Sequence, residues 1–411
     1  MSRDEGAGGL SAWARTWVAE ALGSPTAVQA EAWPVLADRH DAVLVAPTGS
    51  GKTLAAFLAA LDRLQHTPAT ERSRVLYVSP LKALAFDIER NLRSPLVGLQ
   101  QIAGREGSGD GTVKGTSEIT PISVAVRTGD TPQNERTQQA KNPPDVWITT
   151  PESLYLLLTS QARSALAEVD TIIIDEVHAL VGTKRGAHLA LSIERLEALT
   201  GKRVQRIALS ATVQPVSEVA RYVRAVDPDS VKVIAPPIDK RIVVEVESTV
   251  ADFDRIGEVV VDDEGNDVVS GSAAKDAERE SVWPSVAERV VDIVAAHRSS
   301  IVFVNSRRLA ERLTARINER AEERELCSAE EPLARAHHGS VSKDVRRSIE
   351  DDLKQGRLRT VVATSSMELG IDMGEVDVVV QIQSPTSVSS GLQRVGRAGH
   401  GVGETSVGHV I

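Results

Sequence analysis

Short apolar runs that end in polar residues recur through the first half of the chain. They predict strands at residues 42–46, 75–79, 123–127, 145–149, 171–175 and 206–209. Segments with apolar residues at three- and four-residue spacing, which is typical of helices, separate most of these runs. Alternating strands and helices predict an α/β fold built on a doubly wound parallel sheet, with functional residues at the carboxyl ends of the strands.

The same pattern returns after Pro236-Pro237, where the composition changes. Strands are predicted at 241–246, 301–304, 360–363 and 376–382, and a helix at 286–296. Because 411 residues exceed what one core usually covers, we predict two tandem domains, residues 1–235 and 236–411. Segment 105–120 is expected to be a mobile surface insertion, and the acidic segment 251–281 a solvated hairpin or a disordered stretch.

Composition changes this picture in two respects. With a net charge of −10 and a pI near 5.5, any binding to nucleic acid must use a local groove, because an acidic surface repels a polyanion. The single cysteine, Cys327, excludes an internal disulfide, and we find neither a secretory leader nor an apolar run of ~20 residues. These features predict a cytoplasmic protein with no membrane contact.

The residues between the first strand and the next helix predict a phosphate-binding loop. They are Ala46, Pro47, Thr48, Gly49, Ser50, Gly51, Lys52 and Thr53. The glycines let the chain turn so that successive N–H groups point inward at the N-terminus of a helix. Lys52 is expected to bind the outer phosphates of ATP, and the Thr53 hydroxyl to ligate Mg²⁺. Ala46 stands where the generic pattern has glycine.

Gln29 lies on the helix that precedes this loop. Its amide donates and accepts hydrogen bonds, so it has the chemistry to read an adenine edge. The alternative is an ordinary surface glutamine.

One strand of the first domain ends in two adjacent carboxylates, Asp175 and Glu176, after a fully apolar run. We expect Asp175 to hold Mg²⁺ and Glu176 to deprotonate the water that attacks the γ-phosphate of ATP. An isolated Asp-Glu pair is usually a solvated helix start. Here the pair follows a buried strand downstream of a phosphate loop, which favours the catalytic interpretation.

These motifs together resemble the superfamily-two helicases, which pair two RecA-like domains around one ATP. The resemblance covers nearly the whole chain. Gln29 resembles the Q motif, and further motifs match at 46–53, 79–84, 149–152, 175–178, 210–212, 301–306, 364–372 and 393–400. It implies an ATP site in the cleft between the domains, to which the second domain contributes Asp372 and Arg397.

The resemblance also implies a groove that holds the phosphates of a single strand. The residues that match it are Lys82, Arg127, Thr150, Asn305 and Thr364. Contacts of this kind do not read the base sequence, and a few cations suffice for them even in an acidic protein. Ser210 and Thr212 are expected to couple this groove to the ATP site.

Within the superfamily, segments 79–84, 175–191 and 299–313 resemble the large helicase-related proteins, the Lhr family. This resemblance implies an ATP-dependent translocase that moves 3′ to 5′ on single-stranded DNA, unwinds duplexes or RNA–DNA hybrids and serves DNA repair. His400 departs from the family pattern, which has a second arginine there, so Arg397 is the chief candidate for the arginine finger. The family also continues beyond the last motif, so we interpret the chain as the motor core.

Two alternatives remain open at this stage. An RNA-remodelling ATPase carries nearly the same motifs, and an ATP-gated clamp would grip nucleic acid without unwinding it. His337 and His338 suggest a metal site, but no Cys or carboxylate lies at ligand spacing, so we favour a hydrogen-bonding pair.

Overall fold

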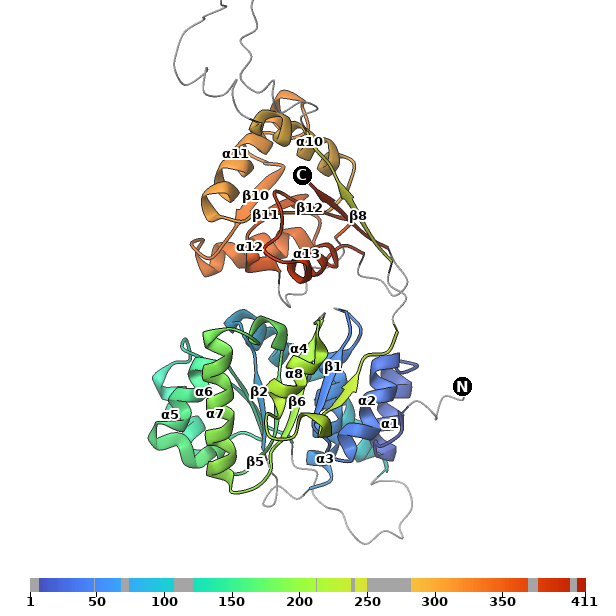
Figure 1. Cartoon of the computed structure of the whole chain (residues 1–411), viewed down its shortest axis with the longest axis vertical. Helices are drawn as coiled ribbons and strands as arrows, with labels where there is room; N and C mark the ends of the chain where they lie inside the picture. Colours follow the sequence, from blue (N-terminus) through green and yellow to red (C-terminus); the bar gives the residue numbers. More distant parts are fainter. Residues whose placement is uncertain are drawn as a thin grey trace, which may run out of the picture. The chain divides into compact units, whose positions relative to one another are not determined.

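The computed structural model describes residues 7–47, 49–67, 74–106, 121–211, 213–237, 241–249, 282–368, 376–399 and 405–411. The chain divides into two compact units, Met1–Ile238 and Asp239–Ile411 (Figure 1). The boundary expected from the sequence, after residue 235, lies close to this division. The insertion expected at 251–281 and most of the one at 105–120 lie outside the described residues.

The first unit is built on a seven-stranded parallel sheet with the strand order β3-β4-β2-β5-β6-β1-β7. Its strands are β1 (Ala42–Val45), β2 (Arg74–Val78), β3 (Val124–Arg127), β4 (Val146–Thr149), β5 (Val169–Ile174), β6 (Gln205–Ser210) and β7 (Lys232–Ile234). The central strands are almost entirely buried and their middle residues are mostly apolar, as expected for strands covered on both faces. The prediction of a doubly wound parallel sheet is confirmed for this unit.

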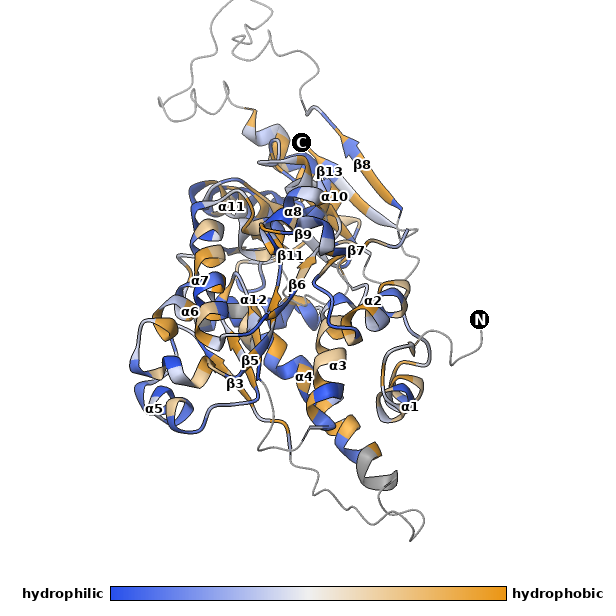
Figure 2. Ribbon diagram, turned by 60° about the horizontal axis from the view of Figure 1, so that its bottom comes forward, coloured by the Kyte–Doolittle hydropathy of each residue, from blue (hydrophilic) through white to orange (hydrophobic). Residues whose placement is uncertain are grey.

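Helices cover both faces of this sheet, which gives three layers. They are α1 (Ala12–Ala21), α2 (Ala27–Ala37), α3 (Lys52–Gln65), α4 (Lys82–Glu106), α5 (Gln133–Lys141), α6 (Pro151–Leu158), α7 (Lys184–Thr200) and α8 (Val216–Val223), with 3₁₀ turns η2 (Gln161–Leu166), η3 (Val177–Ala179) and η4 (Pro228–Ser230). One core forms between the sheet and α1–α4, and a second forms between the sheet and α6–α8. Figure 2 shows hydrophobic and hydrophilic stretches alternating along α4.

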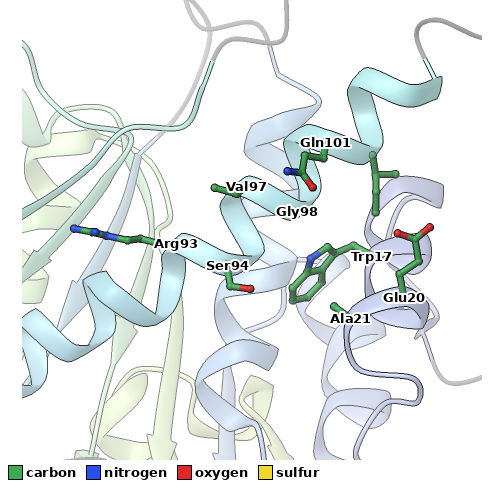
Figure 3. Close-up of a pocket in the computed structure, with 9 residues that line it drawn as sticks. Trp17, Glu20, Ala21, Arg93, Ser94, Val97, Gly98 and Gln101 are labelled. Carbon is green, nitrogen blue, oxygen red and sulfur yellow. The ribbon is translucent and has the colours of Figure 1, made fainter. Parts of the chain in front are cut away.

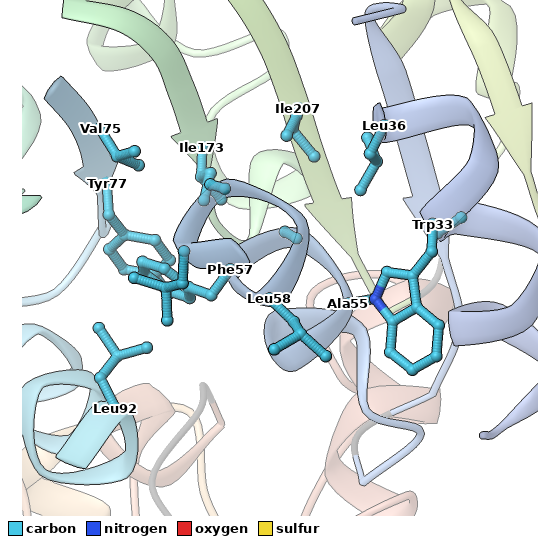
Figure 4. Packing of buried hydrophobic residues seen from close by; sticks show 14 of the residues in the cluster. Trp33, Leu36, Ala55, Phe57, Leu58, Val75, Tyr77, Leu92, Ile173 and Ile207 are labelled. Carbon is cyan, nitrogen blue, oxygen red and sulfur yellow. The ribbon is translucent and has the colours of Figure 1, made fainter. Parts of the chain in front are cut away.

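Aromatic residues fill the first of these cores. Trp33, Phe57 and Tyr77 are fully buried (Figure 4). The rings of Phe57 on α3 and Tyr77 on β2 stack with centroids 5.0 Å apart and planes inclined by 27°. Such a pair contributes about 0.5–1.5 kcal/mol beyond its burial. The stack therefore ties α3 to the middle of the sheet.

The packing of α1 on α4 depends on a glycine. A Cβ atom at Gly98 would lie 2.0 Å from Nε1 of Trp17, so only glycine allows the indole to lie against the α4 backbone. A surface pocket of about 530 Å³ remains beside this contact (Figure 3). It is lined by Trp17, Glu20, Ala21, Arg93, Ser94, Val97, Gly98, Gln101 and Ile102, none of which belongs to a predicted site.

The second unit has a six-stranded parallel sheet with the order β10-β11-β9-β12-β13-β8. Its strands are β8 (Ile242–Val246), β9 (Ser300–Phe303), β10 (Ala334–His337), β11 (Thr360–Ala363), β12 (Val378–Gln381) and β13 (Ser406–Val410). The other elements are α10 (Trp283–Ala295), α11 (Arg307–Glu323), α12 (Lys343–Lys354), α13 (Val388–Val395) and the turn η6 (Ser365–Met367). Two cores lie on its two faces, so this unit also confirms the predicted class.

Sequence patterns missed β13, which inserts between β12 and β8. Its residues, Ser-Val-Gly-His-Val, include a glycine and a histidine and lack the apolar run that marks the other strands. Gly408 is required there, because a Cβ atom would lie 2.4 Å from the side chain of Val395 on α13. Within the described residues, no helix is long and apolar enough to cross a bilayer.

Candidate nucleotide and nucleic-acid sites

The predicted phosphate loop lies at the carboxyl end of β1 and leads directly into α3. Gly49 and Gly51 both have positive φ angles, 79° and 84°, which glycine adopts without strain. Helix α3 begins at Lys52, so Lys52 and Thr53 lie in its first turn. Thr48 lies outside the described residues.

Lys52 lies back along this loop. Its Nζ donates to the carbonyl oxygens of Ala46 and of Pro47, the latter at 2.8 Å, and the residue is 9% exposed. The ammonium group is thus held among loop oxygens at the mouth of the helix. A phosphate oxygen would replace these carbonyls as its partner.

Residues at the N-terminus of α2 make hydrogen bonds to the same loop. The Thr26 hydroxyl donates to Ser50 O at 2.8 Å, and the Gln29 amide donates to Gly51 O at 3.4 Å. Gln29 Oε1 also accepts from Thr26 N–H at 3.0 Å, which completes a capping box. Gln29 is 3% exposed, so the surface alternative is wrong. Both ends of its amide already have partners in the protein.

Asp175 and Glu176 follow β5 directly and are both 7% exposed. Asp175 Oδ1 accepts from Glu176 N–H at 2.9 Å, and Oδ2 accepts from the Tyr77 hydroxyl. Burial, together with the charge of Glu176, raises the pKa of Asp175 to about 7. Glu176 has a φ of 44°, which turns the chain sharply after the strand. Two carboxylates are thereby held side by side at the sheet edge.

These carboxylates fit a hard divalent cation. Magnesium prefers oxygen ligands, and Asp175 and Glu176 supply buried carboxylate oxygens close enough to each other to disfavour double ionisation. Lys52 is the cation whose charge acts on Asp175. The residues that would hold Mg²⁺ are Asp175 and Thr53, and the ion when bound neutralises charge on the phosphates.

His178 connects these carboxylates to the neighbouring strand. Its Nδ1 lies 3.1 Å from Ser210 Oγ and 3.5 Å from Glu176 Oε2. Ser210 is the last residue of β6 and is fully buried. The structure thus brings the predicted coupling residue Ser210 next to the predicted base through one imidazole. The other predicted coupling residue, Thr212, lies outside the described residues.

In the second unit, two arginines lie around one glutamate. Arg397 is 2% exposed, and its Nη2 donates to Glu368 O at 2.7 Å. Arg394 is held by Glu368 Oε2 at 2.9 Å and Gln381 Oε1 at 2.7 Å, with its guanidinium over the Phe303 ring. Asp372 and His400, expected in the same region, lie outside the described residues.

The predicted nucleic-acid residues of the first unit differ in exposure. Lys82 is about half exposed and forms an ion pair with Asp130, with Nζ and Oδ1 2.6 Å apart. Arg127 donates to Gln139 Oε1 at 3.3 Å. Thr150 is 2% exposed, and its hydroxyl donates to Ser153 Oγ at 3.1 Å, directly before the start of α6.

The two predicted nucleic-acid residues of the second unit lie at the ends of neighbouring strands. Asn305 follows β9 and is exposed, and its Nδ2 donates to Ser384 O at 3.0 Å. Thr364 follows β11 and begins η6. Strands β9 and β11 are paired, so both residues lie at the same edge of the sheet.

The histidine pair near this edge makes hydrogen bonds. His337 contacts Ser366 Oγ at 2.9 Å and Glu350 Oε1 at 3.0 Å, and His338 contacts Glu311 Oε1 at 2.6 Å. Among the described residues, one cluster of three His, Cys, Asp or Glu side chains has its ligand atoms close together, and it consists of Glu245, Glu247 and His409. Its Glu247 already accepts from Arg289 at 2.6 Å, which supplies the positive charge that a metal would bring.

Sequence reasoning missed Tyr77 as a member of the site, although one signal was present. It is the only polar side chain in the run Val75–Val78, which is otherwise apolar and buried.

Two family models match the chain. The DEAD/DEAH box helicase model matches residues 26–219, and the helicase conserved C-terminal domain matches residues 285–401. An Lhr helicase and probable uracil glycosylase of Mycolicibacterium smegmatis is 52% identical over 98% of this chain. The Lhr helicase and uracil glycosylase of Escherichia coli is 47% identical over 96% of it. The chain spans about a quarter of the length of each of these relatives (26%).

A solved structure is similar across the same span. The M. smegmatis helicase Lhr bound to single-stranded DNA and AMP-PNP matches 99% of this chain with a TM-score of 0.81 and 52% identity. The match covers 48% of that chain.

Proposed function

Because the chain belongs to the Lhr family of superfamily-two helicases, we propose that it is an ATP-dependent helicase core. It hydrolyses ATP with Mg²⁺ and uses the energy to move along single-stranded DNA in the 3′-to-5′ direction. In this proposal the protein works in the cytoplasm and serves DNA repair.

One observation carries the function. The phosphate loop with Lys52, the carboxylates Asp175 and Glu176, and Ser210 all lie at the carboxyl ends of neighbouring strands in one sheet. Lys52 acts electrostatically on Asp175, and His178 joins Glu176 to Ser210. A phosphate-binding cation, a metal-binding carboxylate and a base are the parts that phosphoryl transfer to water requires.

The chain's own residues divide the work as follows. Backbone N–H groups of 46–53 and the Lys52 ammonium bind the β- and γ-phosphates of ATP. Thr53 and Asp175 hold Mg²⁺, and Glu176 orients the attacking water and accepts its proton. Gln29 reads the adenine edge in addition to its contacts with the loop. Asp372 and Arg397 contribute from the second unit, Arg397 as the cation for the transition state.

Nucleic acid is held by its phosphates. Lys82, Arg127 and the start of α6 at Thr150 contribute from the first unit, and Asn305 and Thr364 from the second. One comparison supports DNA as the ligand: the similar M. smegmatis structure, 52% identical to this chain, contains single-stranded DNA.

The experiment that tests this function is strand displacement with ATP. The substrates are duplexes with a 3′ or a 5′ single-stranded tail of DNA, and the same duplexes with RNA tails. We expect displacement from the 3′ DNA tail only. Displacement from RNA tails alone would indicate an RNA-remodelling ATPase, and tight ATP-dependent binding without displacement from any tail would indicate a clamp.

A further inference from the structure

We propose that Tyr77 is a positioning residue for the ATPase reaction, which holds the Asp175 carboxylate in the orientation that binds Mg²⁺. The inference rests on the proposed function, because it takes Asp175 as the metal-binding carboxylate. Tyr77 lies on β2, next to the strand that leads to Asp175, and lies outside the short motif segments 46–53, 79–84 and 175–178.

The position of Tyr77 is fixed from three sides. Strands β2 and β5 pair in parallel, with Tyr77 opposite Ile173. The pairing continues past the strand ends, since Asp175 N–H donates to Val78 O at 2.9 Å. The ring is fully buried and stacks on Phe57, which lies on the helix that carries Lys52 and Thr53 (Figure 4). The phenol oxygen therefore has little freedom to move.

This rigid phenol donates to one oxygen of the carboxylate. Tyr77 binds Oδ2 and the Glu176 N–H binds Oδ1, so both oxygens of Asp175 have one donor each. Two donors from different strand positions fix the plane of the carboxylate about its Cβ–Cγ bond. Each oxygen keeps a further lone pair for a cation or for a water molecule bound to it. Partners that orient a metal-binding side chain in this way commonly strengthen metal binding by 10–100-fold.

The simpler explanation is that Asp175 merely satisfies a buried hydroxyl. The residues that share the core with Tyr77, among them Phe57, Val75 and Ile173, are fully buried and apolar, so this core has no need of a hydroxyl. A phenylalanine at position 77 would pack in the same way and would avoid the cost of burying a polar group. Among the described residues, the hydroxyl makes its one hydrogen bond with Asp175 Oδ2, which points to a role at the carboxylate.

The test compares Tyr77→Phe with the parent chain and with Tyr222→Phe. The Phe variant keeps the ring and its stack on Phe57 and removes only the donor. Tyr222 is the control, since the hydroxyl of this partly buried side chain also makes a hydrogen bond in this unit, to Gly186 O at 2.8 Å rather than to a carboxylate. Binding of a fluorescent, non-hydrolysable ATP analogue is measured by titrating Mg²⁺, and again in EDTA.

For Tyr77→Phe we expect the Mg²⁺ concentration at half-maximal binding to rise about 10-fold or more, with affinity in EDTA unchanged. Tyr222→Phe is expected to titrate like the parent. If Tyr77→Phe titrates like the parent, or if both variants lose affinity equally with and without Mg²⁺, the positioning role is wrong. If the parent itself binds the analogue no better with Mg²⁺ than in EDTA, the assignment of Asp175 to Mg²⁺ fails, and the proposed function fails with it.

Discussion

The imidazole of His178 and the hydroxyl of Ser210 lie 3.1 Å apart, although 32 positions separate them in the chain. Because Nδ1 of the same ring lies 3.5 Å from Glu176 Oε2, a change at Ser210 reaches the proposed base through one side chain. Ser210 ends β6, the strand next to β5, which carries the carboxylates. We propose that this contact couples the binding of single-stranded DNA to ATP hydrolysis.

Ser210→Ala removes the hydroxyl from this contact. We expect ATP hydrolysis stimulated by single-stranded DNA to stay within a few-fold of the parent. Strand displacement per ATP is expected to fall roughly tenfold, because a tenfold change corresponds to the loss of one hydrogen bond of about 1.4 kcal/mol. Ser192→Ala is the matched control, because Ser192 is also buried and its hydroxyl donates to His188 O at 2.9 Å. Equal losses of hydrolysis and displacement in Ser210→Ala would refute the coupling role.

The Lys82–Asp130 ion pair predicts two opposite effects on affinity for single-stranded DNA. Lys82→Ala removes a phosphate contact, so affinity falls and the salt dependence of binding weakens by about one charge. Asp130→Asn removes the carboxylate that competes with phosphate for this ammonium, so affinity rises. Both are read from binding isotherms at several salt concentrations. Lys202→Ala, which breaks an ion pair with Glu168 before β5, should change neither the affinity nor its salt dependence. A strong preference for one base sequence would contradict binding through phosphates.

Arg397 is expected to act on the transition state of ATP hydrolysis. An arginine of this kind is worth roughly 10³–10⁵ in rate, so Arg397→Ala should nearly abolish stimulated turnover while ATP binding stays within a few-fold. His400→Ala should cost much less, because a neutral imidazole cannot supply the charge.

A melting curve separates this role from a structural one. Arg397 is buried and bonded to Glu368 O, so a packing role would lower the melting temperature of Arg397→Ala together with its turnover. Arg320→Ala, on the partly exposed face of α11, serves as the control for loss of an arginine.

The sequence predicted the two sheets and the phosphate loop because both depend on local patterns. Apolar runs mark buried parallel strands, and the spacing of Gly49, Gly51 and Lys52 defines the loop wherever a helix follows. Strand β13 was missed because Ser406–Val410 lacks an apolar run, and Tyr77 was missed because its role depends on a partner far along the chain. The role of the Tyr77 hydroxyl can be recognised only when the position of Asp175, 98 residues away, is known. The hydrogen bond from the Gln29 amide to Gly51 O likewise depends on the packing of α2 against the loop, which local patterns do not show.

Asp41 predicts how stability depends on pH. Burial alone raises its pKa, but hydrogen bonds from Arg224 and Arg203 outweigh this effect and hold the pKa below its usual range. Because the pKa is lowered in the folded state, the ionised carboxylate stabilises the fold at pH values above the unfolded-state pKa of ~3.9. This stabilisation is lost as the pH falls through the lower folded-state pKa. Asp41→Asn should therefore cost roughly 1–3 kcal/mol at pH 7 and progressively less below about pH 4.

Urea unfolding at pH 7 and at pH 3.5 measures this difference. Glu218→Gln, which breaks an exposed pair with Arg221, should change the free energy of unfolding by no more than about 0.5 kcal/mol at either pH. A cost for Asp41→Asn that is the same at both pH values would show that the carboxylate charge does not stabilise the fold.

The most direct test of the central claim is steady-state ATP hydrolysis with and without single-stranded DNA, in the parent chain and in Glu176→Gln. The amide keeps the shape of the side chain and removes the base, whose loss costs about 10²–10⁴ in rate. We predict that DNA stimulates the parent, and that the variant binds ATP within a few-fold of the parent but hydrolyses it at least 100-fold more slowly. Parent turnover that neither DNA nor RNA stimulates, or normal turnover in Glu176→Gln, would contradict the account.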